Sequence, residues 1–268
     1  MKEVIIREVL AYNLEYEFNL IHRAIHEGHF IISMDTEFPG VIHFPKTDRR
    51  HLQTVDQYRY LKVNVDNLKL IQVGLTISDS EGNLPDFGTN NCYIWEFNFC
   101  DFDVNNDLCN QESVDMLRRQ GIDFERNFCH GVDSRRFADL MLSSILVFNK
   151  SVTWVTFSSG YDFGYLVKIL TGMNLPNQLE DFLTVIEVLF GKNVYDMKHM
   201  MKFCNSLYGG LERVAATLNV SRAVGNSHQA ASDSLLTWQA FNQMMKTYFK
   251  NDEASKHAGV LYGLDIAV

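Results

Sequence analysis

The sequence contains few of the features that mark secreted, membrane-bound or low-complexity proteins. Its 268 residues include only 4 prolines and show neither a biased tract nor a repeat of fixed period. No stretch approaches the roughly 18 apolar residues of a membrane-spanning helix. The first residues, MKEVIIREVL, are interrupted by charges and do not have the apolar centre of a secretory signal. We therefore expect a soluble protein that does not bind a membrane.

Paired cysteines are also absent. The 5 cysteines are an odd number without C-x-x-C spacing, which argues against a disulfide framework and a structural zinc site and favours a reducing, intracellular compartment. They are Cys92, Cys100, Cys109, Cys129 and Cys204.

Positive charge is in deficit, with 24 basic against 33 acidic residues and a formal net charge of −9. This excludes broad electrostatic coating of nucleic acid, which needs a basic face. An enzyme that holds a short strand at metal ions in a cleft is still compatible with this charge. The composition is 46% hydrophobic and 12% aromatic and shows no Pro-, Gly- or Ser-rich linker, so we predict one globular domain over residues 1–268.

The most informative stretch is residues 30–40, FIISMDTEFPG. Its short, β-branched apolar run, closed by Pro39-Gly40, predicts a buried strand rather than a helix. Residues two apart on a strand point to the same side, so Asp35 and Glu37 would present two carboxylates side by side. Two like charges on a buried element are unfavourable unless a cation lies between them, and hard divalent cations prefer carboxylate oxygens. The alternative is that the strand has ended and both acids are solvated.

Periodicity predicts the other elements. Apolar residues from Leu14 to Ile25 form a helical stripe that ends at Gly28. Further strands are predicted at 68–77, 92–99 and 152–157, and helices at 111–119, 134–147, 161–170, 178–190, 196–205, 210–218 and 230–247. We expect the first three strands to form an antiparallel meander with short turns, within an α/β fold whose mixed sheet is flanked by helices.

Residues 41–60 are polar and are predicted to form a loop. This loop carries a basic cluster, which is either a solvated surface or a contact for phosphates. The cluster consists of Lys46, Arg49, Arg50 and His51.

Three residues outside the first strand combine an acid or an imidazole with a defined position. Asp162 is expected in the first turn of a helix that leaves a strand, where its alternative role is to complement the helix dipole. His228 and Asp233 are five residues apart, which on one helix separates their directions by about 140°. They converge only if the helix begins after His228, and Gly225-Asn226-Ser227 favours that start. For Asp233 the alternative is an acid that faces solvent.

Four carboxylates and one imidazole suit a pair of divalent ions about 3.5–4 Å apart with a phosphate clamped between them. One ion would acidify a bound water, a histidine near its usual pKa of about 6.5 would take the proton, and the second ion would stabilise the leaving 3′-oxygen. Because the ligands are hard oxygens, Mg²⁺ or Mn²⁺ is favoured over zinc.

The order D-x-E, D, H-x₄-D resembles the DEDDh branch of the 3′→5′ exonucleases, whose fold is ribonuclease-H-like. Four longer strings are similar to the CCR-associated-factor family, the poly(A)-specific ribonuclease subunit of the CCR–NOT deadenylase complex. They are FIISMDTEFPG, FSSGYDFGYLVKIL, YDMKHMMK and HQAASDSLLT, and the likeness runs from about Ile6 to Thr247.

This resemblance implies metal ligation by Asp35, Glu37, Asp162 and Asp233, and a general-base role for His228. It implies two Mg²⁺ or Mn²⁺ ions and the shortening of messenger RNA poly(A) tails with release of 5′-AMP. It also implies a NOT-type scaffold and a second deadenylase as partners, and a location in cytoplasm and nucleus.

Two features depart from the family pattern or add to it. Ala231 stands where the family has glycine, which adds a methyl group near the expected metals. The preceding segment SRAVGNSH matches the family pattern less closely than the other strings do. We expect activity to survive. Phe38 would either stack on the terminal nucleotide or pack in the core.

Two other functions are open, a non-catalytic adaptor and a nuclease for other RNA or DNA ends. An adaptor, however, would be free to lose the four acids.

Overall fold

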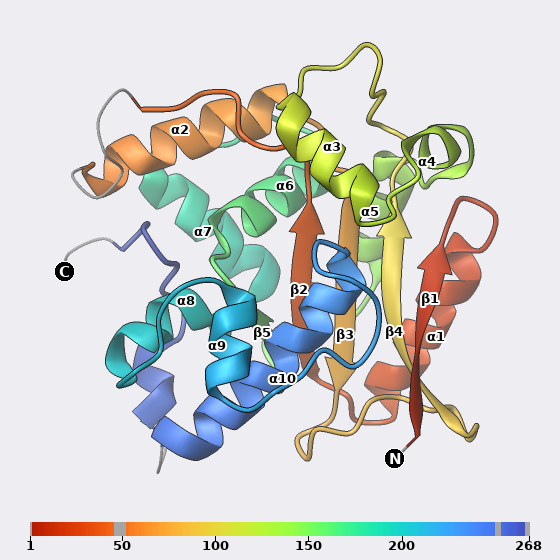
Figure 1. Ribbon diagram of the computed structural model, residues 1–268, viewed down its shortest axis with the longest axis vertical. Helices are drawn as coiled ribbons and strands as arrows, with labels where there is room; N and C mark the ends of the chain where they lie inside the picture. Colours follow the sequence, from red (N-terminus) through yellow and green to blue (C-terminus); the bar gives the residue numbers. More distant parts are fainter. Residues whose placement is uncertain (1, 46–51, 250–252, 266–268) are drawn as a thin grey trace.

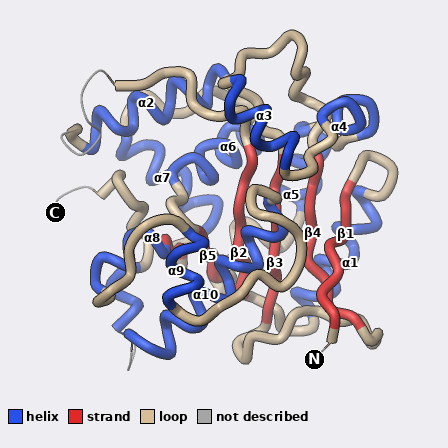
Figure 2. Tube along the Cα trace, viewed as in Figure 1, coloured by secondary structure: helices blue, strands red, loops and turns tan. Residues whose placement is uncertain are grey.

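The computed structural model describes residues 2–45, 52–249 and 253–265. A mixed sheet of order β1-β4-β3-β2-β5-β6 forms its centre, with helices on both faces (Figures 1 and 2). The strands are β1 (Glu3–Val9), β2 (Ile31–Glu37), β3 (Gln72–Ser78), β4 (Asn91–Asn98), β5 (Thr153–Thr156) and β6 (Val194–Asp196). The β2–β3 and β3–β4 pairs are antiparallel, and the β1–β4, β2–β5 and β5–β6 pairs are parallel. The predicted α/β class and the antiparallel order of β2, β3 and β4 are confirmed.

The helices divide between the two faces of the sheet. They are α1 (Leu14–His26), α2 (Thr54–Asn67), α3 (Gln111–Arg119), α4 (Phe124–His130), α5 (Ser134–Ser143), α6 (Gly160–Thr171), α7 (Leu179–Phe190), α8 (Met197–Met200), α9 (Leu211–Thr217) and α10 (Ala230–Tyr248), with 3₁₀ turns at Met201–Phe203 and Glu253–His257. Helix α10 crosses one face, in contact with β2 to β5 and with α9, while α6 packs on β2 between α2 and α5 (Figure 1).

Alternation along β2 assigns its two faces. Ile32 and Met34 are fully buried in the core that includes α1, α5 and α6. Asp35 has Gly74 of β3 as its register partner, and a Cβ built at Gly74 would lie 2.0 Å from the carbonyl carbon and oxygen of Ala230. The first turn of α10 therefore rests directly on the β3 backbone, next to the acidic end of β2.

Several predicted boundaries were wrong. Helix α2 begins at Thr54, so a loop over 41–60 is incorrect for its last part, and α2 also lies within the β2–β3 connection that was expected to be a short turn. The buried side of α2 does show helical spacing, with Tyr58, Leu61 and Val65 three and four residues apart. The basic cluster at Lys46, Arg49, Arg50 and His51 lies outside the described residues.

The sequence did not predict β1, β6 or α4, and it extended the 134–147 helix past its end at Ser143. The missed strands β1 and β6 are the two edges of the sheet, and each has one strand of the sheet beside it, β4 for β1 and β5 for β6. Within the described ranges, no helix has both the length and the apolarity needed to cross a membrane. All five cysteines are free thiols.

Candidate active site

The two acids of β2 lie within the strand and not beyond it. Glu37 is the last residue of β2 and is 8% exposed, and Asp35 is partly buried. The alternative of two solvated acids after the strand is therefore wrong.

Asp162 approaches β2 from α6. The helix begins at Gly160, after residues 157–159 that connect it to β5. The buried carboxylate of Asp162 accepts a hydrogen bond of 2.5 Å from the hydroxyl of Thr36, the residue between the two β2 acids. The junction before α6 is held by Asp196, whose buried carboxylate accepts the backbone N–H groups of Ser158 and Ser159 at 3.0 Å. Sequence reasoning missed both Thr36 and Asp196, because only the fold places them beside Asp162.

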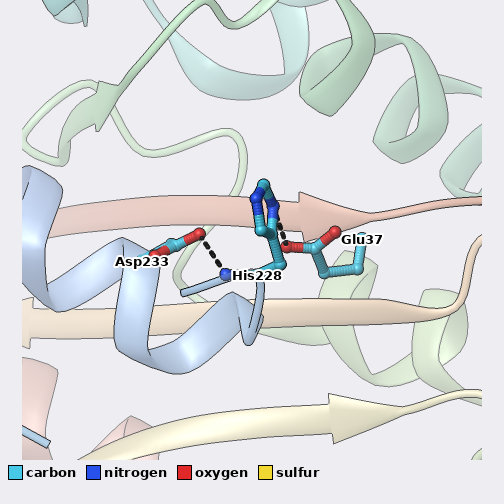
Figure 3. A group of neighbouring side chains, drawn as sticks. All are labelled: Glu37, His228 and Asp233. Carbon is cyan, nitrogen blue, oxygen red and sulfur yellow. Dashed lines mark hydrogen bonds and ion pairs between the residues drawn. The ribbon is translucent and has the colours of Figure 1, made fainter. Parts of the chain in front are cut away.

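His228 precedes α10, as predicted, and has a backbone φ of 59°. Its N–H donates to Asp233 Oδ2 at 3.0 Å, and its ring Nδ1 lies 3.9 Å from Glu37 Oε1 (Figure 3). One ligand atom from each of these three residues lies within 4.8 Å of the others. Asp233 is 8% exposed, so the interpretation of a solvent-facing acid is wrong, whereas the His228 side chain is 49% exposed.

The acids act on one another strongly. Burial raises the pKa of Asp35 and of Glu37 well above the usual range, and for both carboxyls the charges of Asp233 and Asp162 raise it further. Burial also raises the pKa of Asp162 to about 7. Charges shift a carboxyl pKa in this way only over short distances, so Asp162 and Asp233 lie near both acids of β2. The structure thus brings acids from three distant segments of the chain to the end of β2.

Two further charged residues border these acids, and their place in the site was not predicted from the sequence. Arg222 places Nη2 2.6 Å from Asp233 Oδ1. Glu96, on β4, has its pKa raised to about 7, mainly by burial, and its charge in turn raises the pKa of Glu37. Register places Glu96 opposite Gly74, which is opposite Asp35, so the three lie in one row across the sheet.

Divalent metal ions fit this set of donors. Four largely buried carboxylates face one arginine and one half-exposed histidine, which leaves negative charge that only protons or further cations can balance. Their oxygens are the hard ligands that Mg²⁺ and Mn²⁺ prefer. The pairing of two ions and the role of each residue stay predictions.

Phe38 and Ala231 lie in apolar surroundings. The Phe38 ring stacks on Tyr161 at a centroid distance of 5.0 Å, lies 5.0 Å from the Tyr165 ring and packs against the core. This favours the packing role, and contact with a nucleotide stays a prediction. Ala231 is fully buried in the apolar cluster beneath α10, which accommodates its methyl group.

Comparison with known proteins places the chain among ribonucleases. A model described as CAF1 family ribonuclease matches residues 9–136. A probable CCR4-associated factor 1 homolog 7 from Arabidopsis thaliana is 50% identical over 264 residues, which cover 97% of this chain and 94% of that protein. The chain belongs to the CAF1 ribonuclease family.

Other CAF1 relatives extend this finding. The poly(A) ribonuclease pop2 of Schizosaccharomyces pombe is 42% identical over 264 residues, 97% of this chain and 75% of that protein. The structure of S. pombe Pop2p in its Mg²⁺ and Mn²⁺ bound form has a TM-score of 0.88 at 40% identity and covers 97% of this chain and 99% of that one. The structure of yeast CAF1, co-crystallised with the NOT1 MIF4G domain, has a TM-score of 0.77 at 32% identity and covers 96% of both chains. The family and the ribonuclease-H-like fold expected from the sequence are confirmed.

Proposed function

We propose that this chain is a divalent-metal-dependent 3′→5′ exoribonuclease that shortens poly(A) tails and releases 5′-AMP. The observation that carries this proposal is the convergence of Asp35, Glu37, Asp162 and Asp233, with His228 beside them, at the end of β2. Membership of the CAF1 family, together with 42% identity to a poly(A) ribonuclease, supports the substrate class.

The four acids would hold two Mg²⁺ or Mn²⁺ ions, which when bound would polarise the phosphate and acidify the attacking water. Thr36 orients Asp162 through its hydroxyl, and the His228 N–H orients Asp233. The imidazole of His228 is half exposed and lies next to Glu37, so it is reachable by a water at the site and can take its proton.

The test uses 5′-labelled RNA that ends either in a run of A or in mixed bases, with Mg²⁺, Mn²⁺ or EDTA. We expect a ladder that shrinks from the 3′ end, stops at the first non-A residue and disappears in EDTA, with 5′-AMP as the product. Equal rates on both RNAs would show an exonuclease without preference for A. If neither RNA is shortened in either metal, the proposed activity is wrong and the adaptor alternative gains support.

We further propose that residues 1–268 form one catalytic domain of a CCR–NOT-type complex, with a NOT-type scaffold and a second deadenylase as partners. The co-crystal of yeast CAF1 with the NOT1 MIF4G domain supports the scaffold. The second deadenylase and the location in cytoplasm and nucleus rest on the family resemblance. Co-purification from cells and imaging of the tagged chain test these proposals, and a chain that co-purifies with neither partner contradicts them.

A further inference from the structure

Arg222 lies between α9 and α10, and its side chain is only 15% exposed. Its guanidinium is held from several sides. Nη2 forms an ion pair with Asp233 Oδ1 at 2.6 Å and donates a hydrogen bond to Glu212, while Nη1 donates to Ser232 Oγ at 2.5 Å and to the Asn226 carbonyl oxygen at 3.2 Å. A guanidinium fixed by this many acceptors is part of the site and not a loose surface charge.

Both carboxylate oxygens of Asp233 are engaged in this arrangement. Oδ1 pairs with Arg222, and Oδ2 accepts the N–H of His228. Asp233 is also one of the three residues whose ligand atoms lie within 4.8 Å of one another. A cation that binds this group must therefore share Asp233 with the arginine.

We propose that Arg222 is an internal counter-ion that competes with the divalent ion for Asp233. This inference rests on the metal site of the proposed function. Without metal, the guanidinium neutralises one carboxylate of a crowded acidic cluster and so stabilises the folded chain, because a buried carboxylate without a partner is strongly destabilising. With metal, the fixed positive charge opposes the incoming cation, since charges a few ångströms apart in a protein repel appreciably.

The decisive variant is Arg222→Met, with Arg135→Met on the exposed side of α5 as a control for the loss of one positive charge. Isothermal titration with Mn²⁺ gives the metal Kd, and thermal unfolding in EDTA and in Mn²⁺ gives Tm. We expect Arg222→Met to bind Mn²⁺ about tenfold more tightly, which is the effect of about 1.4 kcal/mol. In EDTA its Tm should fall by about 4 °C, and Mn²⁺ should restore it. Arg135→Met should match the wild type in both measurements.

Three results would overturn the inference. An unchanged Kd and Tm would mean that Arg222 carries no such charge role, and weaker Mn²⁺ binding would mean that it supports Asp233 and does not compete with the metal. If Arg222→Met is insoluble even with Mn²⁺, Arg222→Lys decides, because the positive charge that opposes the cation is retained and should keep the Kd within about threefold of wild type. A larger change contradicts the proposal. A wild-type chain that binds no Mn²⁺ would overturn the proposed function itself, which separates the two failures.

Discussion

The acids of the site differ in how they are held, and this difference sets what each substitution should do. Asp35 and Glu37 are fixed by the strand itself, whereas Asp162 and Asp233 are oriented by the hydroxyl of Thr36 and the N–H of His228. Asp162 thus has one orienting neighbour, whereas Asp233 has two, because it also pairs with Arg222. Removal of a single acid should disturb the chemistry far more than the fold.

The substitution Asp35→Ala should abolish shortening of 3′-adenylated RNA in Mg²⁺ while Tm stays at or above the wild-type value in EDTA. The physical reason is that Asp35 is crowded by three other carboxylates, so its loss relieves repulsion in the metal-free chain. Asp139→Ala, at an exposed position of α5, is the control and should retain full activity. Undiminished turnover in Asp35→Ala would remove Asp35 from the ligand set.

His228→Ala separates a general base from a metal ligand. A base contributes typically 10²–10⁴-fold to the rate, so we expect single-turnover hydrolysis to slow by about that factor while the Mn²⁺ Kd stays within about threefold. His130→Ala, at an exposed position of α4, should change neither quantity. A large loss of Mn²⁺ affinity would make His228 a ligand, which its place in the three-residue group also allows.

At the scale of elements, the site depends on how closely α10 approaches the sheet. The glycine at position 74 lets the first turn of α10 lie on β3, and this contact brings His228 and Asp233 to the end of β2. The Thr76 and Ser234 hydroxyls, 2.8 Å apart, join the two elements one turn further along. The helix start and the strand end therefore form one unit.

Gly74→Ala should separate that unit. The added methyl group would meet the Ala230 backbone at 2.0 Å, so α10 must shift, and overpacking of this kind costs about 1–3 kcal/mol. We expect a lower Tm together with a loss of activity greater than the loss of folded protein. Gly210→Ala is the matched control, because its φ is −89° and no atom lies within 4 Å of the new Cβ. If Gly74→Ala and Gly210→Ala show the same Tm and the same activity, close packing at Gly74 does not position the site.

At the scale of the whole molecule, the uncompensated acids should make stability depend on pH and on metal. The pKa of Asp162 is about 7 in the folded chain and about 3.8 without burial, so between these values the folded state holds the extra proton. Stability therefore falls as pH rises through this window, by at most about 1.4 kcal/mol per pH unit for one group. A bound divalent cation should remove the loss by compensating the charge.

Denaturant unfolding in EDTA at pH 4.5 and 7.5 checks this expectation. The wild type should lose stability relative to Asp162→Asn as pH rises, because the amide does not titrate. At pH 7.5, Mg²⁺ should reduce this difference in the free energy of unfolding. The opposite order, with Asp162→Asn less stable at pH 7.5 in EDTA, would mean that the carboxylate is favourably paired without metal.

Several parts of the site could be predicted because they depend on local order. The short, β-branched apolar run closed by Pro39-Gly40 defines β2, and the Gly225-Asn226-Ser227 stretch leaves His228 outside the following helix. The start of α6 next to Asp162 follows from the change from the strand expected at 152–157 to the helical spacing expected from residue 161. In each case the residues that decide the conformation are neighbours in the chain, so the pattern and the outcome lie in the same short segment.

Other parts were decided only by the tertiary structure. The edge strands β1 and β6 exist because β4 and β5 offer them backbone partners, and the row from Asp35 through Gly74 to Glu96 depends on register between strands. Arg222 meets Asp233 only after its loop folds back on α10. The sequence by itself thus determined the chemistry of the acids and the family. Strand pairing and burial decided which charged residues meet, because hydrogen bonding and desolvation act between segments that are far apart in the chain.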